Sequence, residues 1–320
     1  MSKQPNAVRV VAGCDDGSIR IWDLEDGSAR HLPDMTHAEP VTAVATGLDD
    51  DAPVLVSSSA TGPVRTWWLA SATPVGPALP GGDPVAVASV DGRLVVIAPD
   101  AHDRVCVWDP RTAREVVAFE GLHPPVTALA VTRLPRGSVV VIGHGAGHLA
   151  VGDLAAGQVV ARMAGGHGQQ VGAIVTTVVD GRSVVVSGAS DGTVRRWDLA
   201  SGAPVGAPSH GHHGPLHAPG RIYALAIAPL AGRPVAVSSG WDGELWMWDL
   251  ASGERIGEPL DDNHGDVQAL IASQHAGRQH VVCGGIDELV LRVWDLDHRT
   301  LARVLPGPAH VLALAPLPPH

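Results

Sequence analysis

Four histidines are crowded into one short segment, and their spacing suits transition-metal chemistry. They are His210, His212, His213 and His217, with glycine and proline residues between them. Neutral imidazoles are good ligands for Zn, Cu and Ni, so three or four of them could hold one ion. The segment contains no carboxylate or cysteine that would complete the ligand set. Two interpretations stay open, a metal site and a flexible loop, and the missing ligands favour the loop.

A serine framed by glycines offers a second kind of chemistry. Gly188–Gly192 has the G-x-S-x-G spacing of a hydrolase nucleophile elbow, which needs a strand on one side and a helix on the other. Here β-type sequence flanks the segment on both sides, and Cys14–Gly17 and Gly240–Gly243 repeat its pattern. We interpret it as a tight turn between strands. The sequence therefore assigns no catalytic residue and favours a protein that is not an enzyme.

The turn belongs to a repeat that runs through the whole chain. Seven segments are variants of one Trp-Asp motif, at residues 21–24, 66–69, 107–110, 151–154, 196–199, 247–250 and 293–296. A Val-x-Ala pattern or a close variant occurs seven times in step with it, at residues 41–45, 85–89, 126–130, 171–175, 222–226, 267–271 and 311–315. Two motifs in register over seven units leave little room for coincidence.

Each unit is predicted to form four short antiparallel strands, named a, b, c and d here in chain order. In the fifth unit, residues 171–175 begin strand a, residues 184–188 form strand b, and strand c ends at Trp197. The tight turn between strands b and c contains Asp191 and Gly192. No segment shows sustained 3.6-residue apolar periodicity with helix caps. We therefore expect an all-β fold with almost no helix.

These residues resemble the WD-repeat β-propeller family, whose blades carry a Gly-His before strand a and a Trp-Asp at the end of strand c. The resemblance covers essentially the whole chain. It implies a single seven-bladed propeller over residues 1–320, with four-stranded antiparallel blades. The chain begins with a strand b, Val8–Gly13, and ends with a lone strand a, Ala309–Pro316. We expect a composite first blade, residues 8–32 plus 309–316, to close the ring and remove the exposed edges.

The resemblance also implies a hydrogen-bonded tetrad within each blade. Its members are a His before strand a, a Ser or Thr on strand b, an Asp in the b–c turn and a Trp on strand c. The fifth unit matches it fully with His167, Ser187, Asp191 and Trp197. The sixth unit has no His in register, and the fourth keeps His123 but has Ala146 for the Asp and Gly152 for the Trp. We interpret these residues as architectural and expect the fourth blade to be the loosest.

Composition limits the function classes. The chain has 22 Lys+Arg against 33 Asp+Glu, a formal net charge of −11, which argues against nucleic-acid binding driven by phosphate contacts. Its three cysteines lie far apart without C-x-x-C spacing, so neither a disulfide framework nor a cysteine zinc site is indicated. No apolar run approaches the roughly 18–20 residues of a membrane span. We expect a cytoplasmic monomer without membrane or nucleic-acid partners.

Two groups of surface residues are candidates for partner binding. The top face of the expected ring carries the b–c turns and d–a loops, and the bottom face carries the a–b and c–d loops. On the top face the candidates are Trp241 and the turn residues Asp100, His102 and Asp103, because an exposed aromatic side chain is a suitable binding anchor. On the bottom face, guanidinium groups recur in five a–b loops and could dock an acidic segment or phosphate: Arg93, Arg136, Arg182, Arg233 and Arg278.

The expected function is that of a non-catalytic scaffold that binds a protein or peptide partner and needs no cofactor. One alternative is an enzyme or a small-ligand protein whose site, at the top mouth of the channel, uses the His210–His217 loop and binds Zn, Cu or Ni. A second alternative is the sensor propeller of a bacterial signalling system. The fold alone cannot choose between them, since propellers host many unrelated functions.

Overall fold

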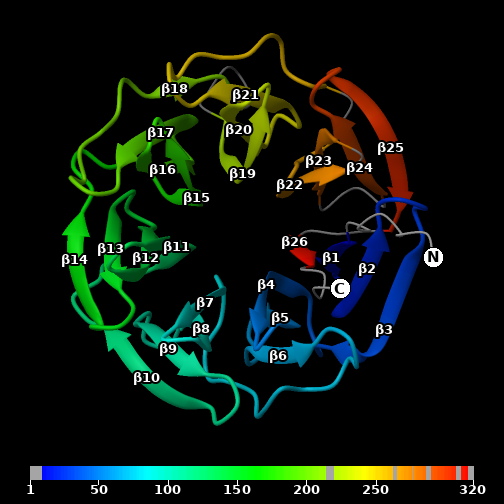
Figure 1. Cartoon of the computed structure of the whole chain (residues 1–320), viewed down its shortest axis with the longest axis vertical. Coiled ribbons are helices and arrows are strands. Elements are labelled where there is room, and N and C mark those ends of the chain that lie inside the picture. The colour runs from blue at the N-terminus through cyan, green and yellow to red at the C-terminus, as the bar shows by residue number, and fades with distance from the viewer. Residues whose placement is uncertain are drawn as a thin grey trace.

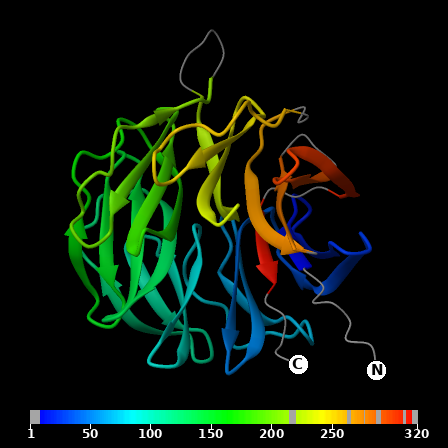
Figure 2. The same ribbon diagram turned by 45° about the horizontal axis from the view of Figure 1, so that its top comes forward.

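The computed structural model describes residues 9–213, 220–261, 265–275, 277–285, 290–307 and 311–315. In these ranges every helix or strand element is a β strand, arranged as seven antiparallel sheets around a ring (Figure 1). Figure 2 shows the blades standing side by side with their strands running between the two faces of the ring. The predicted all-β, seven-bladed propeller is confirmed. No helix of the described ranges is long and apolar enough to cross a membrane.

The first four blades follow the predicted order of strands. Blade one contains β26 (Val311–Ala315), β1 (Arg9–Gly13), β2 (Ser18–Asp23) and β3 (Ala29–Thr36). Blade two contains β4 (Val41–Asp49), β5 (Ala52–Ser59) and β6 (Arg65–Trp68). Blade three contains β7 (Ala86–Val90), β8 (Arg93–Pro99), β9 (Val105–Asp109) and β10 (Arg114–Phe119). Blade four contains β11 (Val126–Leu134), β12 (Gly137–His144), β13 (Leu149–Asp153) and β14 (Gln158–Arg162).

The remaining three blades repeat the pattern. Blade five contains β15 (Val171–Val179), β16 (Arg182–Ala189), β17 (Thr193–Asp198) and β18 (Ser209–His210). Blade six contains β19 (Ile222–Leu230), β20 (Arg233–Gly240) and β21 (Leu245–Asp249). Blade seven contains β22 (Ala269–His275), β23 (Arg278–Gly284), β24 (Val290–Asp295) and β25 (Thr300–Pro306). In blades two and six, isolated bridges such as Val64 with Leu79 and Leu245 with Leu260 stand in for the fourth strand.

The two ends of the chain meet in blade one. Strand β26 pairs antiparallel with β1, in a register that places Arg9 opposite Ala315 and Gly13 opposite Val311. Figure 1 shows β26 at the inner end of the blade, beside β1. The outer strand β3 continues to Thr36, beyond the predicted end at residue 32. Val8 and residues 309, 310 and 316 of the predicted closing segments lie outside the described residues.

The apolar core lies between blades because the second strand of each blade is covered on both faces. Strands β12 and β16 have six consecutive buried residues, whereas the outer strand β14 has none. A continuous apolar run is the pattern expected of a strand buried on both sides. Side chains of neighbouring blades form shared clusters, such as Met35 of blade one with Leu55 and Trp67 of blade two. Each blade is thus stabilised by its two neighbours.

A buried arginine adds polar links between blades five and six. The Arg196 side chain is 5% exposed, and its Nη1 donates to the carbonyl oxygens of Leu250 at 2.7 Å and Ala251 at 3.3 Å. Its Nη2 donates to the Ser252 carbonyl at 3.2 Å. The forked guanidinium reaches three acceptors of one loop, which a lysine ammonium could not match in geometry. Burial lowers the pKa of Arg196, and the negative charge of Asp249 opposes this shift.

A complete tetrad lies in blade six, where the sequence showed no histidine in register. Trp248 Nε1 donates to Ser238 Oγ at 2.8 Å, and that hydroxyl lies 2.8 Å from His212 Nε2. His212 Nδ1 lies 2.9 Å from Asp242 Oδ1. A neutral His212 protonated on Nδ1 satisfies the whole chain, since the carboxylate then accepts, the Ser238 hydroxyl donates to Nε2 and the indole donates to the hydroxyl.

Blade five, predicted to hold the full tetrad, lacks one of its links. His167 contacts Ser187 Oγ at 2.6 Å and Asp191 at 3.2 Å as expected. The Trp197 indole instead donates to the Ala164 carbonyl at 3.2 Å, and its ring meets the His167 ring edge-on at a centroid distance of 5.5 Å. The assignment of Trp197 to the network was therefore wrong. Its ring packs on the network without a hydrogen bond to Ser187.

Blade four has replaced the tetrad with apolar side chains. In blade five His167 lies four residues before the first residue of β15, and the same count before β11 reaches Leu122, not His123. Ile142 occupies the strand b position of Ser187, as the strand registers show. The missing Trp is replaced from blade three, because the fully buried Phe119 ring lies where a side chain on Gly152 would extend. Phe119 thus fills the space that the missing Trp leaves in blade four, and the expectation that this blade is the loosest stays a prediction.

We expect acid to weaken blade two. His37 lies 2.8 Å from Ser57 Oγ and is 8% exposed, and burial, reinforced by Arg65, lowers its pKa to about 4. The unfolded chain takes up this proton near pH 6.5, so stability is full above that pH and falls as the pH drops toward 4, by up to about 3 kcal/mol. Denaturant unfolding at several pH values should show a shallower decline for His37→Gln. Parallel declines for both proteins would contradict the assignment.

Candidate protein-binding surface on the top face

The b–c turn of blade six presents an aromatic side chain to solvent. Trp241 is 51% exposed, and its backbone N–H donates to the Arg221 carbonyl at 3.1 Å. Gly243, with φ +76°, takes the left-handed position that closes this turn, which a side chain would strain. Asp242 of the same turn accepts from the backbone N–H of His213 at 3.0 Å and from buried His212. The Trp241 side chain is therefore carried on a turn that is fixed from two sides.

The segment bonded to the Trp241 turn carries two further side chains that sequence reasoning missed, those of Arg221 and Tyr223. Arg221 is exposed, and its guanidinium carbon lies 5.9 Å from the ring centroid of Tyr223, the only tyrosine in the chain. Its Nε donates to Ser190 Oγ in the b–c turn of blade five at 3.0 Å. The Tyr223 hydroxyl donates to Asp266 Oδ2 at 3.3 Å. A Trp, an Arg and a Tyr thus lie at the junction of blades five and six, and these are the residue types enriched in binding hot spots.

The second predicted top-face segment is mostly occupied with its own turn. The Asp100 carboxylate accepts from the backbone N–H groups of His102 and Arg104 at 2.8 and 3.0 Å, and from Arg104 Nε at 2.8 Å. Burial alone would raise the pKa of Asp100, but these hydrogen bonds outweigh it and hold the pKa below its usual value. Asp103 adopts a left-handed φ of 57° within the turn. Of these residues His102 is the accessible one, with a side chain 84% exposed.

The two top-face candidates lie far apart. The Asp100–Asp103 turn joins β8 to β9, and the Trp241 turn joins β20 to β21; Figure 1 shows these strand pairs on opposite sides of the ring. The structure therefore does not combine Trp241 with Asp100, His102 and Asp103 in one compact site. The segment bonded to the Trp241 turn is the one that carries Arg221 and Tyr223, since the Trp241 backbone N–H donates to the Arg221 carbonyl.

The four histidines of the predicted metal loop are divided between different roles. His212 is 3% exposed and both its ring nitrogens are engaged by Ser238 and Asp242, so it belongs to the tetrad of blade six. Because both its ring nitrogens are engaged, His212 is not free to bind a metal, and the predicted set of four ligands loses one member. His210, in β18, and His213 are exposed. His217 lies outside the described residues, and a metal at this loop stays a prediction without His212.

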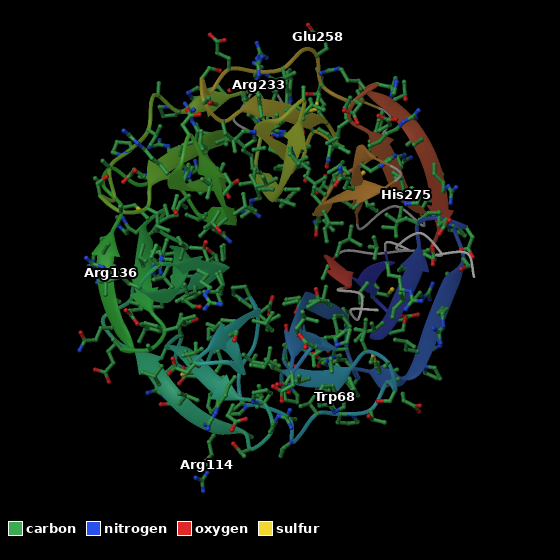
Figure 3. All side chains as sticks on the ribbon, viewed as in Figure 1. Trp68, Arg114, Arg136, Arg233, Glu258 and His275 are labelled. Carbon is green, nitrogen blue, oxygen red and sulfur yellow. The ribbon has the colours of Figure 1, made fainter. Side chains whose placement is uncertain are left out.

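Two of the five bottom-face arginines form ion pairs with the Asp of a Trp-Asp motif. Arg233 Nη1 lies 3.5 Å from Asp249, and Arg278 Nη1 lies 3.4 Å from Asp295, with arginine side chains 75% and 59% exposed. Hydrogen bonds from Ser201, with a smaller contribution from Arg182, lower the pKa of Asp198. Figure 3 places Arg136 and Arg233 toward the outer edge of the ring. The binding role proposed for Arg93, Arg136, Arg182, Arg233 and Arg278 stays a prediction.

A family model matches most of the chain. The PQQ_2 model, described as outer membrane protein assembly factor BamB, matches residues 10–257. This is a different propeller family from the WD-repeat family that the motifs resemble. The comparison therefore agrees with the predicted fold and differs from the predicted family.

Curated relatives match over one short segment. The angio-associated migratory cell proteins of Pongo abelii and Canis lupus familiaris are 49% identical to this chain over 47 residues, and the Homo sapiens protein is 47% identical over 47 residues. The match covers 14% of this chain and 11% of each relative. The chain thus spans only about a tenth of the length of these relatives.

A solved structure matches over nearly the whole chain. The crystal structure of the computationally designed Ika8 protein superposes with a TM-score of 0.64 and 25% sequence identity. The superposition covers 96% of this chain and 86% of the designed protein. It supports the ring architecture over nearly the whole chain.

Proposed function

The chain belongs to the family described as outer membrane protein assembly factor BamB, and from this membership and the exposed top-face residues we propose that it is a non-catalytic scaffold that binds a protein or peptide. The observation that carries the proposal is Trp241, 51% exposed on a fixed turn beside Arg221 and Tyr223. Trp, Arg and Tyr are the residue types enriched among the anchors of protein interfaces, and this is what favours a partner at this surface.

The construction of the top face suits the binding of a partner. The turn that carries Trp241 is held by the tetrad through Asp242, and the Arg221 side chain is held by the Ser190 hydroxyl and the Tyr223 ring. Side chains that are ordered before binding lose less conformational entropy when a partner covers them. A partner that packs against Trp241 and accepts hydrogen bonds from the guanidinium of Arg221 fits this surface.

We also propose that the repeats are of the WD type. The support is the Trp–Ser–His hydrogen-bond chain, present in blade six and in blade two, where Trp67 Nε1 donates to Ser57 Oγ at 2.9 Å and His37 lies 2.8 Å from that oxygen. The Asp of the Trp-Asp motif caps the following turn, as when Asp249 accepts from the backbone N–H groups of Ala251 and Ser252. These interactions explain why both residues of the motif recur.

Trp241→Ala should weaken partner binding without changing stability. Truncation of an aromatic anchor at an interface costs about 2 kcal/mol or more, which is roughly a 30-fold loss of affinity, whereas truncation of an exposed residue changes stability by less than about 0.5 kcal/mol. A partner captured with the wild-type protein from a lysate of the source cell, then purified, allows calorimetric titration of both proteins.

Val160→Ala is the matched control, since Val160 is 58% exposed on the outer strand β14, away from the top-face turns. It should bind with wild-type affinity. Equal affinity of Trp241→Ala and the wild-type protein, or a lowered melting temperature with binding intact, would reject this surface.

A further inference from the structure

Three histidines gather at the top of blade four, outside the surface described above. His144 ends β12 and His148 lies just after the b–c turn, and His123 comes from the loop that precedes β11. The ring centroids of His123 and His144 are 6.4 Å apart, and those of His123 and His148 are 5.8 Å apart. The backbone N–H of His144 donates to the His148 carbonyl at 3.0 Å, which holds these two residues opposite each other across the turn.

Strand β12, the second strand of blade four, contributes His144, whose environment is unusual. His144 is 0% exposed. A backbone group of His123 is a hydrogen-bonding neighbour of its ring, and at least one of the two ring nitrogens has no partner among the described residues. A buried polar group without a partner is costly, so such a group in a native structure calls for an explanation. In the same register blade five has Ala189, blade six has Gly240 and blade two has Ser59, so the strand does not require an imidazole here.

The three histidines lie where other blades have a side-chain hydrogen bond between the b–c turn and the loop before strand a. Among its described residues, blade four lacks this hydrogen bond. In blades five and six, a carboxylate of the b–c turn ties the turn to the loop before strand a: Asp191 accepts from the Gly168 backbone N–H at 3.1 Å, and Asp242 accepts from that of His213 at 3.0 Å. In blade four Ala146 takes the place of the carboxylate, so the side-chain link is absent. His123 and the pair His144 and His148 project from the same two segments.

We propose that His123, His144 and His148 bind a divalent transition-metal ion of the Zn²⁺ class, which ties the loop before β11 to the b–c turn of blade four. Three neutral imidazoles leave the fourth position of a tetrahedral ion open for water. A neutral imidazole is the form that binds a metal ion.

The distances between the histidine rings are close to those of a metal site, and small movements of the side chains would bring them together around one ion. Two imidazoles on one tetrahedral Zn²⁺ have ring centroids about 5 Å apart, given Zn–N bonds of about 2.0–2.1 Å. The two measured separations, 6.4 and 5.8 Å, exceed this by about an ångström. In the described part of the chain, no group of three or more His, Cys, Asp or Glu side chains is placed so that it could hold a metal ion as it stands, so the exposed rings of His123 and His148 must turn toward His144. Exposed side chains make such changes rapidly.

The test is Zn²⁺ binding by the untagged full-length protein, measured by competition with a chromophoric chelator, with the absorption of bound Co²⁺ as a second signal. Three variants copy the residues of blade five at the same positions: His123→Gly, His144→Ala and His148→Thr. The wild-type protein should bind one ion, and each variant should lose about tenfold or more in affinity. If His144→Ala does not fold, His123→Gly and His148→Thr, both at exposed positions, test the proposal.

Two control variants separate this site from other histidines. His102→Ala removes an exposed imidazole elsewhere on the top face and should bind as the wild type does. The double variant His210→Ala and His213→Ala should also retain binding, and a loss there instead would move the site to that loop and overturn the proposal. Absence of saturable binding, or unchanged binding in all three blade-four variants, would also overturn it. Hydrogen exchange should show Zn²⁺-dependent protection at both the loop before β11 and the b–c turn.

Discussion

Deletion of residues 309–320 should abolish cooperative folding of the ring. The deletion removes β26, which pairs with β1 along all five residues of that strand and also contacts the inner strands β4 and β22 of the neighbouring blades. Loss of β26 exposes the backbone groups of β1 as an open edge and uncovers apolar side chains such as that of Val10, which is fully buried. We expect aggregation, or a broad transition at much lower temperature.

Calorimetry and light scattering should be measured on the full chain and on the 309–320 deletion. A shorter deletion of residues 317–320 keeps β26 whole and should unfold as the full chain does. A synthetic peptide of residues 309–320, added in excess to the truncated protein, should restore part of its stability because it can pair with β1. If the 309–320 deletion melts cooperatively at the temperature of the full chain, ring closure by β26 does not stabilise the protein.

Phe119→Ala should destabilise the protein by about 3–5 kcal/mol, the range for removal of a buried aromatic ring. Phe119 is 0% exposed and fills the space beside Gly152, where six of the seven motif segments have a tryptophan. The ring also joins the apolar cluster that links blades three and four. Its removal therefore leaves a cavity between two blades.

A double-mutant cycle tests whether Phe119 replaces the missing side chain. Gly152→Phe alone should destabilise, since a Cβ at residue 152 would lie 2.4 Å from Phe119 Cε1. In the Phe119→Ala background the same substitution should recover stability, with a coupling of about 1–3 kcal/mol. Urea unfolding of the four proteins gives this coupling. Additive effects would show that the two positions do not share one space.

Most of the fold could be predicted from the sequence because each blade repeats the same constraints. The recurring Trp-Asp motifs fixed the spacing of strand c, and the lone Val311–Ala315 strand could only be placed beside β1. The network within the blades was harder to predict. His212 was missed because nine residues separate it from β19, whereas three separate His167 from β15. The Gly211-His212 dipeptide was the signal that could have identified it.

The surface could be predicted only in part, since it depends on contacts between separate loops. The exposure of Trp241 follows from its position in a tight turn, but nothing in the sequence indicates that Arg221 contacts both Ser190 and Tyr223. Similarly, the count from β11 that assigns Leu122 rather than His123 to the tetrad position requires the strand boundary to one residue. Boundaries at that precision come from the structure.

Site-specific photo-crosslinking tests the proposed binding surface most directly. A photoreactive amino acid is placed at residue 241 in one protein and at residue 160 in another, both at exposed positions. After illumination in a lysate of the source cell, the label at residue 241 should give a discrete adduct that Arg221→Ala diminishes, and the label at residue 160 should give none. An adduct of equal yield at residue 160, or none at residue 241, would contradict a partner-binding surface at the junction of blades five and six.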